Sequence, residues 1–214
     1  MPNDFAALKS RIAGELNRSD MNSQIAGSIL RAIERYADQR FWFNEGRGTQ
    51  VTSAGNSYVD IPAGLREMDG PDGRDGRGLL IAVGAAPYVL SPEDPSWIEY
   101  MLQANPGQGQ PVSFARVGSQ FRVYPLPDNA YALTATGIYD VSPAYDGTDD
   151  TVINAWSDSA QDLTTAQVKL FIDRDILRDS EAAGADVAQL NEALAALRLQ
   201  NAKRLSRGRN LPSF

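Results

Sequence analysis

The chain has 214 residues, enough for one large domain or for a domain with a substantial insertion, and its 43% of hydrophobic residues can build a core. It contains no cysteine and no histidine, which excludes disulfides, thiolate nucleophiles, Cys/His zinc sites and histidine-based triads. The sequence shows neither a membrane-spanning run nor a signal peptide, so we expect synthesis in the cytoplasm of the producing cell and no membrane partner.

The net charge of -7 is unevenly distributed. All 27 acidic residues lie at or before Glu192, whereas five of the 20 basic residues follow it. These five are Arg198, Lys203, Arg204, Arg207 and Arg209. An acidic body disfavours DNA wrapping, because phosphate binding needs cations. The basic end is interpreted either as a contact for an acidic partner or nucleic acid, or as a simple complement to a helix dipole.

Two amphipathic helices are predicted before residue 40. Asp4 can cap the first, and Asp20 or Asn22 can cap the second. Their apolar residues recur every three or four positions: Phe5, Leu8, Ile12 and Leu16, then Ile25, Ile29, Ile33 and Tyr36. Such a hairpin is not stable alone, so its apolar stripe must pack against a later part of the chain.

The middle of the chain, from about Phe41 to Tyr145, holds most of the glycine and proline and predicts short strands. These strands are expected at 49–53, 58–61, 79–83, 88–90, 112–117, 120–125 and 131–140. Gly118 and Ser119 predict a type II′ hairpin turn. The polar segment Asp69–Gly78 lacks EF-hand spacing, so we expect a flexible loop there rather than a metal site.

A short helix is expected to interrupt these strands. Ser91 is its predicted cap and Pro92 its first residue. Trp97 and Met101, with Ile98 and Leu102 as further candidates, are predicted to form its apolar face, and Asn105-Pro106-Gly107 to end it.

Two further helices are predicted after Thr151. A capping box at 164–167 is expected to begin the first, and Gly184 to separate it from the second, which extends to about Leu205. Their apolar positions are Val168, Phe171, Ile172 and Ile176, then Val187, Leu190, Leu194 and Leu197. The second stripe spans less than two heptads, which favours an intramolecular seam over a coiled coil.

Together these elements predict an α+β protein. The terminal helical hairpins, residues 1–40 and 151–207, are expected to pack into a helix bundle. Residues 41–150 would form an inserted antiparallel β lobe, and residues 208–214 an extended C-terminal tail.

Two stretches go beyond generic patterning. One is RFWFNE at 40–45, directly after a helix; the other runs from GQP at 109–111 through YPLPD at 124–128 to YAL at 131–133. With the opening helix, this ordered set resembles the head-to-tail adaptor (connector) proteins of tailed bacteriophages, chiefly short-tailed ones. The similarity covers nearly the whole chain.

The resemblance implies a structural protein of the virion neck, not an enzyme, with no cofactor and no metal. It implies a ring, expected to be dodecameric, that binds the portal protein above and tail proteins (nozzle or tail tube) below. Genomic DNA would pass through the ring without specific binding. The resemblance also implies a C-terminal segment that reaches into the portal, whereas the plain alternative is a disordered terminus. The predicted portal-docking residues are Arg204, Arg207, Arg209, Leu211, Pro212 and Phe214.

Two further groups are singled out. Phe41, Trp42 and Phe43 are predicted to be core at the junction of helices and β lobe, with a ligand platform as the alternative. Tyr124, Pro125 and Pro127 are expected to end an edge strand, since proline cannot donate to a ladder; that edge is a candidate contact with a neighbouring subunit or the tail.

Two other functions stay open. A nucleic-acid-binding or assembly-chaperone module would use the basic C-terminus and bind DNA in a salt-sensitive way. A cell-wall hydrolase would need two carboxylates about 5 to 9 Å apart. The nominal carboxylates are Glu45, Glu67, Glu93 and Glu99, and none has a recognisable catalytic context.

Overall fold

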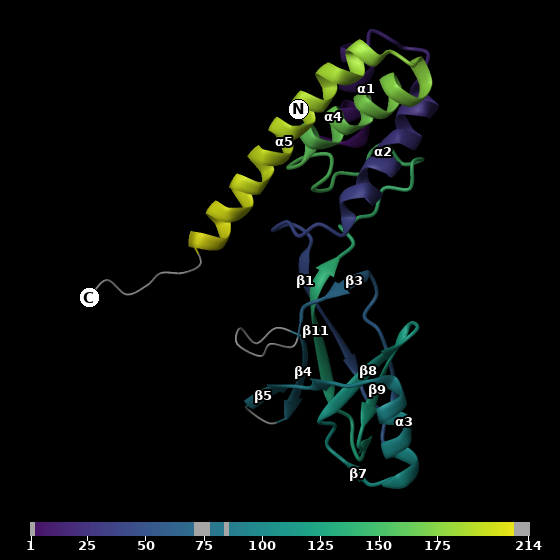
Figure 1. The fold of residues 1–214 in the computed structure, drawn as a ribbon, viewed down its shortest axis with the longest axis vertical. Helices are drawn as coiled ribbons and strands as arrows, with labels where there is room; N and C mark the ends of the chain where they lie inside the picture. Colours follow the sequence, from purple (N-terminus) through teal and green to yellow (C-terminus); the bar gives the residue numbers. More distant parts are fainter. Residues whose placement is uncertain (1–2, 71–77, 84–85, 208–214) are drawn as a thin grey trace, which may run out of the picture. The chain divides into compact units, whose positions relative to one another are not determined.

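The computed structural model describes residues 3–70, 78–83 and 86–207 (Figure 1). The chain forms two compact units, one built from Met1–Asn44 with Val141–Phe214 and the other from Glu45–Asp140. We call them the helical unit and the β unit. Helices dominate one and antiparallel sheets the other, which confirms the predicted α+β class.

Helix α4 is the centre of the helical unit, because it contacts α1, α2 and α5. The elements are α1 (Phe5–Glu15), α2 (Asn22–Ala37), α4 (Gln161–Phe171), a π-helical turn η1 (Ile172–Leu177) and α5 (Ser180–Arg207). Their apolar stripes meet in one core that includes Phe5, Ile12, Ile25, Ile29, Trp156, Leu163 and Phe171. Burial of these stripes supplies the stability that the isolated hairpins lack.

The helix starts follow local hydrogen bonds. Asp4 caps α1 as predicted, since its carboxylate accepts a hydrogen bond from the Ala7 amide at 2.8 Å. The predicted cap of α2 was wrong. Met21 occupies that position without a side-chain hydrogen bond, and the Asp20 carboxylate binds Arg18 instead.

The last two helices, α4 and α5, both begin at other residues than predicted. Helix α4 begins at Gln161, so the expected capping box lies inside it, and the Thr164 hydroxyl donates to the Ala160 carbonyl at 3.1 Å. The chain turns at Arg178, which has a left-handed φ of 57°, and Asp179 then accepts hydrogen bonds from the first amides of α5. Gly184 lies within α5, where a helix tolerates glycine at a cost of about 1 kcal/mol.

The β unit contains a larger and a smaller sheet. The larger has the order β1 (Glu45–Val51), β11 (Ala132–Tyr139), β4 (Leu79–Val83) and β5 (Ala86–Val89), with β3 (Leu65–Met68) also paired to β11. The smaller has the order β2 (Tyr58–Asp60), β9 (Gln120–Tyr124), β8 (Ser113–Val117) and β6 (Ser91–Pro92). A short parallel pair joins β7 (Gln108–Gly109) to β10 (Leu126–Pro127). Ile81, Leu90, Phe121, Val123 and Leu133 lie in the shared core.

The hairpin turn was predicted correctly. Gly118 has a φ of 61° between the paired residues Val117 and Gln120. Strand β3 was missed. It pairs with β11 beside Gly137, where a Cβ would collide with the backbone of Glu67.

Helix α3 (Pro95–Ala104) begins later than predicted. Asp94 caps it, and Ser91–Pro92 forms a strand instead. The helix ends at Asn105, as expected, and packs on β8 and β9. Residues 71–77 of the predicted polar loop lie outside the described residues.

Candidate interaction site

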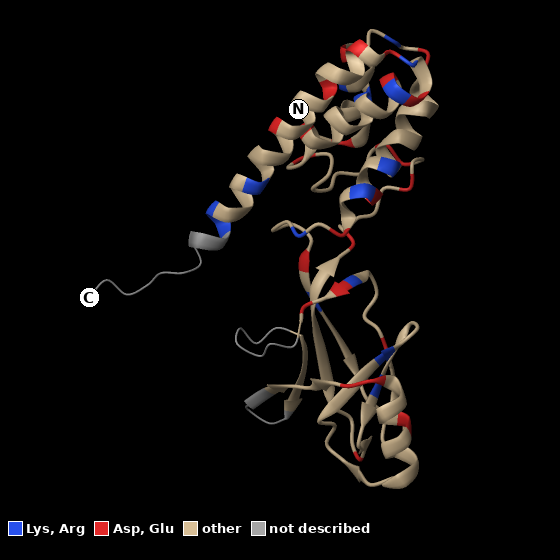
Figure 2. Ribbon diagram, viewed as in Figure 1, with Lys and Arg blue, Asp and Glu red and all other residues tan. Residues whose placement is uncertain are grey.

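The C-terminal half of α5 concentrates positive charge. Figure 2 shows the acidic residues of this helix in its first half and the basic residues in its second. The Arg204 guanidinium lies 4.4 Å from the centre of the Trp42 ring, a cation–π contact. The Asn201 side chain donates to the Arg40 carbonyl at 3.4 Å. The end of α5 is therefore attached to the segment that follows α2.

Only part of the predicted docking segment can be located. Arg204 is exposed at the end of α5, and the backbone of Arg207 belongs to the same helix. Arg209, Leu211, Pro212 and Phe214 lie outside the described residues.

The aromatic run after α2 belongs to the helical unit. Phe41 is 1% exposed, stacks on Phe43 at 5.2 Å and meets the edge of Trp156 at 6.1 Å. Trp42 and Phe43 are partly buried against the same core. Asn44 holds the run in place, because its side chain accepts from the Phe41 amide and donates to the Ala37 and Gln39 carbonyls. The three rings therefore belong to the core, and one face of the Trp42 ring contacts Arg204.

The edge strand expected at Tyr124 and Pro125 is not found, whereas Pro127 lies in β10 of the two-stranded pair with β7. Strand β9 pairs with β2 on one side and with β8 on the other. Pro125 follows the last residue of β9 and so removes no ladder hydrogen bond, which is why its position does not mark an edge. Tyr124 is 9% exposed and packs against Trp97, with ring centres 5.8 Å apart, while Pro127 pairs with Gly109.

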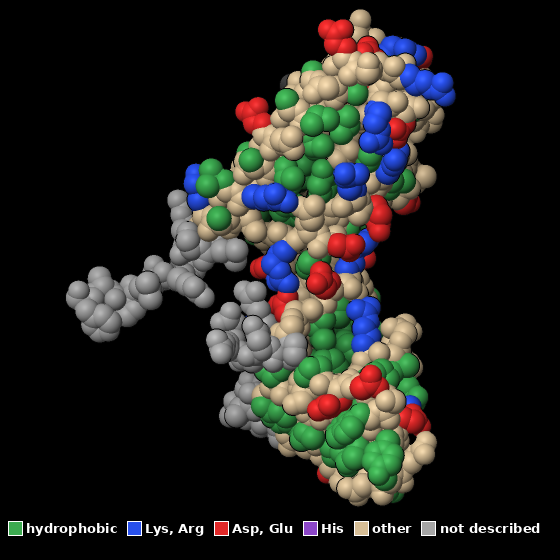
Figure 3. All heavy atoms as spheres, viewed as in Figure 1, with side chains coloured by type: hydrophobic (Ala, Val, Ile, Leu, Met, Phe, Trp, Pro, Cys, Tyr) green, Lys and Arg blue, Asp and Glu red, His purple; other side chains and the backbone are tan. Residues whose placement is uncertain are grey.

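The outer face of α3 carries two exposed aromatic rings, of which the sequence analysis named Trp97, as part of an apolar face, but not Tyr100. Ile98 is the fully buried residue of this helix, whereas Trp97 and Tyr100 are 37% and 66% exposed. Figure 3 shows hydrophobic and acidic side chains side by side on the face of the β unit that it presents. The sequence contains a signal for this face: Trp97 and Tyr100 are three residues apart, so they share a side of the helix that points away from Ile98.

The helical unit also contains a buried carboxyl pair. Asp173 and Asp186 are 6% and 3% exposed. Burial, and then the neighbouring Asp186 carboxyl, raise the pKa of Asp173 to about 6. Lys169 from α4 compensates in part, with its ammonium 3.3 Å from Asp186 and 3.4 Å from Glu15.

The carboxylates considered in the sequence, Glu45, Glu67, Glu93 and Glu99, all lie in the β unit. Glu99 forms an ion pair with Arg122. Across the described ranges, no group of three or more acidic side chains is placed to hold a metal ion. Within the same ranges, no helix combines the length and hydropathy that a membrane crossing requires.

Comparison with known proteins identifies the family. The profile of the SU10 adaptor protein family matches residues 3–212, nearly the entire chain. No curated protein matches the sequence. The resemblance to phage adaptors is therefore confirmed by a match that includes both units. The chain belongs to the SU10 adaptor protein family, a family of structural bacteriophage proteins.

Proposed function

We propose that this protein is a head-to-tail adaptor that forms a ring at the virion neck, between the portal protein and the tail proteins. The family match over residues 3–212 is the observation that carries this proposal. We expect the ring to be dodecameric. The protein would be made in the bacterial host cytoplasm and act without a cofactor.

The charge distribution supports a passive role toward DNA. The first 192 residues hold 15 basic and 27 acidic residues, a net charge of -12. A ring lined mostly by carboxylates repels phosphate, so the genome would slide through it without sticking. Within α5 the basic residues gather toward its C-terminal end, away from the acidic residues of its first half.

The end of α5 is the proposed portal-docking element. Its cations can form charge-assisted hydrogen bonds with an acidic portal surface, and the two apolar residues Leu211 and Phe214 can anchor in pockets there. The contacts of Asn201 and Arg204 hold this end of α5 against the segment after α2.

Deleting residues 209–214 should weaken binding to isolated portal rings about tenfold or more, since the deletion removes both apolar anchors and one cation. Co-sedimentation with purified portal measures this. The matched control is Arg116→Ala, which removes one exposed cation from the β unit and should leave binding unchanged.

Full-strength binding by the deleted chain would contradict the docking role of the tail. If the intact chain instead bound DNA in a salt-sensitive way and ignored the portal, the nucleic-acid-binding alternative would replace the adaptor.

A further inference from the structure

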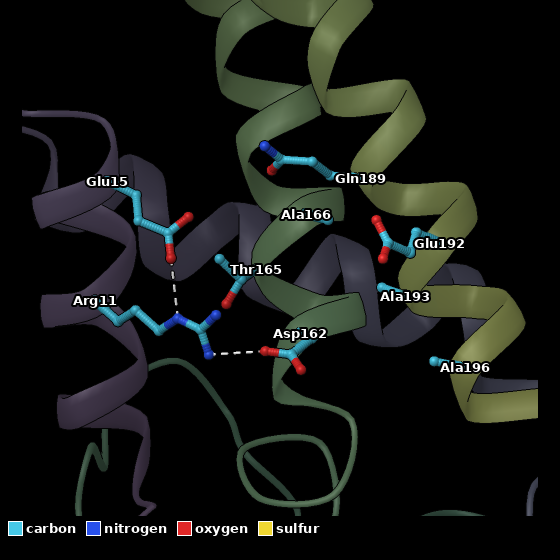
Figure 4. A pocket seen from close by; sticks show the side chains of 9 residues that line it. All are labelled: Arg11, Glu15, Asp162, Thr165, Ala166, Gln189, Glu192, Ala193 and Ala196. Carbon is cyan, nitrogen blue, oxygen red and sulfur yellow. Dashed lines mark hydrogen bonds and ion pairs between the residues drawn. The ribbon is translucent and has the colours of Figure 1, made fainter. Parts of the chain in front are cut away.

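A groove lies between α1, α4 and α5 of the helical unit (Figure 4). Its volume is about 260 Å³, enough for a long side chain. Arg11, Glu15, Asp162 and Glu192 supply its charged groups. Alanines from α4 and α5 line the space between them: Ala166, Ala193 and Ala196. The groove therefore combines an apolar lining with a negative balance of charge.

One polar group in this groove has no partner. The Thr165 side chain is 3% exposed, and its hydroxyl makes no hydrogen bond within the described residues. Figure 4 shows that hydroxyl turned toward the space between α4 and α1. A buried hydroxyl without a partner is costly, so this hydroxyl gains from a hydrogen bond to a group that enters the groove.

The charged side chains of the groove differ in whether they already form ion pairs. Arg11 is engaged on both sides, with Glu15 at 3.0 Å and Asp162 at 2.9 Å. Glu192 forms no ion pair or hydrogen bond with any residue the structure describes. The groove thus offers one unused carboxylate and one unused hydroxyl, which suits a cationic side chain with several donors.

We propose that this groove receives the Arg198 side chain of a neighbouring copy of this chain. Arg198 is exposed and, in the described ranges, makes no ion pair of its own. Its guanidinium can donate to Glu192 and Thr165 of the neighbour, while its methylene stem lies along the alanines. Leu199 beside it is 56% exposed and adds apolar area to the contact.

Glu192 and Arg198 cannot form this contact within one chain. Glu192 and Arg198 are six residues apart on one helix, about 9 Å along its axis and on different sides of it, so they do not pair within a chain. A groove on one copy and a cation on the next form a heterologous contact, which is the kind that closes into a ring. The inference rests on the proposed ring, but it uses none of the portal-docking residues.

Charge reversal tests the pairing. Glu192→Arg and Arg198→Glu should each weaken assembly on isolated portal rings about tenfold, and the double variant should restore it. Binding isotherms measure this, with sedimentation velocity of the protein alone as the second readout. Assembly by either single variant at the wild-type level, or a double variant as poor as the singles, would overturn the proposal.

Substitutions at two adjacent threonines distinguish an effect on assembly from an effect on the stability of the subunit. Thr165→Val should weaken assembly while the subunit becomes as stable as the wild type or more so, because an unsatisfied hydroxyl is removed. Thr164→Val is the control; it removes a satisfied hydroxyl and should lower stability without a specific effect on assembly. Unchanged assembly by Thr165→Val would contradict the role of the groove.

These results remain separable from the adaptor proposal. Portal binding that depends on residues 209–214 but ignores both reversals keeps the adaptor and rejects the groove contact. If the intact chain fails to bind portal, the adaptor proposal fails, and self-association of the protein alone then decides on the groove.

Discussion

Replacing Phe41 with alanine should lower the free energy of unfolding of the helical unit by about 3–5 kcal/mol, the usual cost of removing a buried aromatic ring. The ring is 1% exposed and lies between Phe43 and Trp156, so its loss leaves a cavity that a rigid core cannot close. Hydrogen exchange measured by mass spectrometry, resolved by segment, reports the loss of protection in the helical unit.

The matched control is Tyr100→Ala, which removes a ring that is 66% exposed in the β unit. Its effect should remain within about 0.5 kcal/mol. A Phe41 variant as stable as this control would show that the aromatic run is not core, and would reopen its interpretation as a ligand platform.

Asp173→Asn should stabilise the helical unit at neutral pH and leave its stability at pH 4 nearly unchanged. In the folded protein the pKa of Asp173 rises from 3.8 to about 6, so the folded state holds this proton more tightly than the unfolded state. The stabilisation linked to this proton is complete below pH 3.8 and is lost as the pH rises to about 6.

A rise of the pKa of Asp173 from 3.8 to about 6 corresponds to about 3 kcal/mol. The stability difference between Asp173→Asn and wild type should therefore grow by about that amount from pH 4 to pH 7. Denaturant unfolding at a series of pH values measures this difference. Subtracting the two proteins cancels titrations that they share, such as that of Asp175. Arg174 and Arg31 lower the pKa of Asp175 to about 2. Asp158→Asn, an exposed carboxylate of the same unit, is the control. A flat difference would show that the folded protein does not raise the pKa of Asp173.

Local signals predicted well wherever a hydrogen bond or a repeating pattern decides the structure. The Asp4 cap, the Gly118 turn and strand 79–83 each depend on residues close in sequence. The failures have tertiary causes. Strand β3 exists because Gly137 of a distant strand admits its backbone, and α5, which packs along α4, continues through Gly184.

Part of the candidate interaction site could also be predicted from the sequence. The basic end of α5 and the burial of Phe41 follow from charge and hydrophobicity. The groove does not, because residues of α1 must meet residues of α4 and α5 that lie about 150 or more positions later in the chain, and Thr165 looks like any helical threonine until its partners are known. The edge interpretation of Tyr124 failed because a proline after a strand does not show whether that strand has two neighbours.

Electron cryomicroscopy of mature virions tests the central claim most directly. If this protein is the head-to-tail adaptor, reconstruction of the neck should show a ring of its copies directly below the portal, with the C-terminal segment of each copy reaching into the portal. A neck that lacks this polypeptide, with the portal joined to the tail by other proteins, would contradict the account.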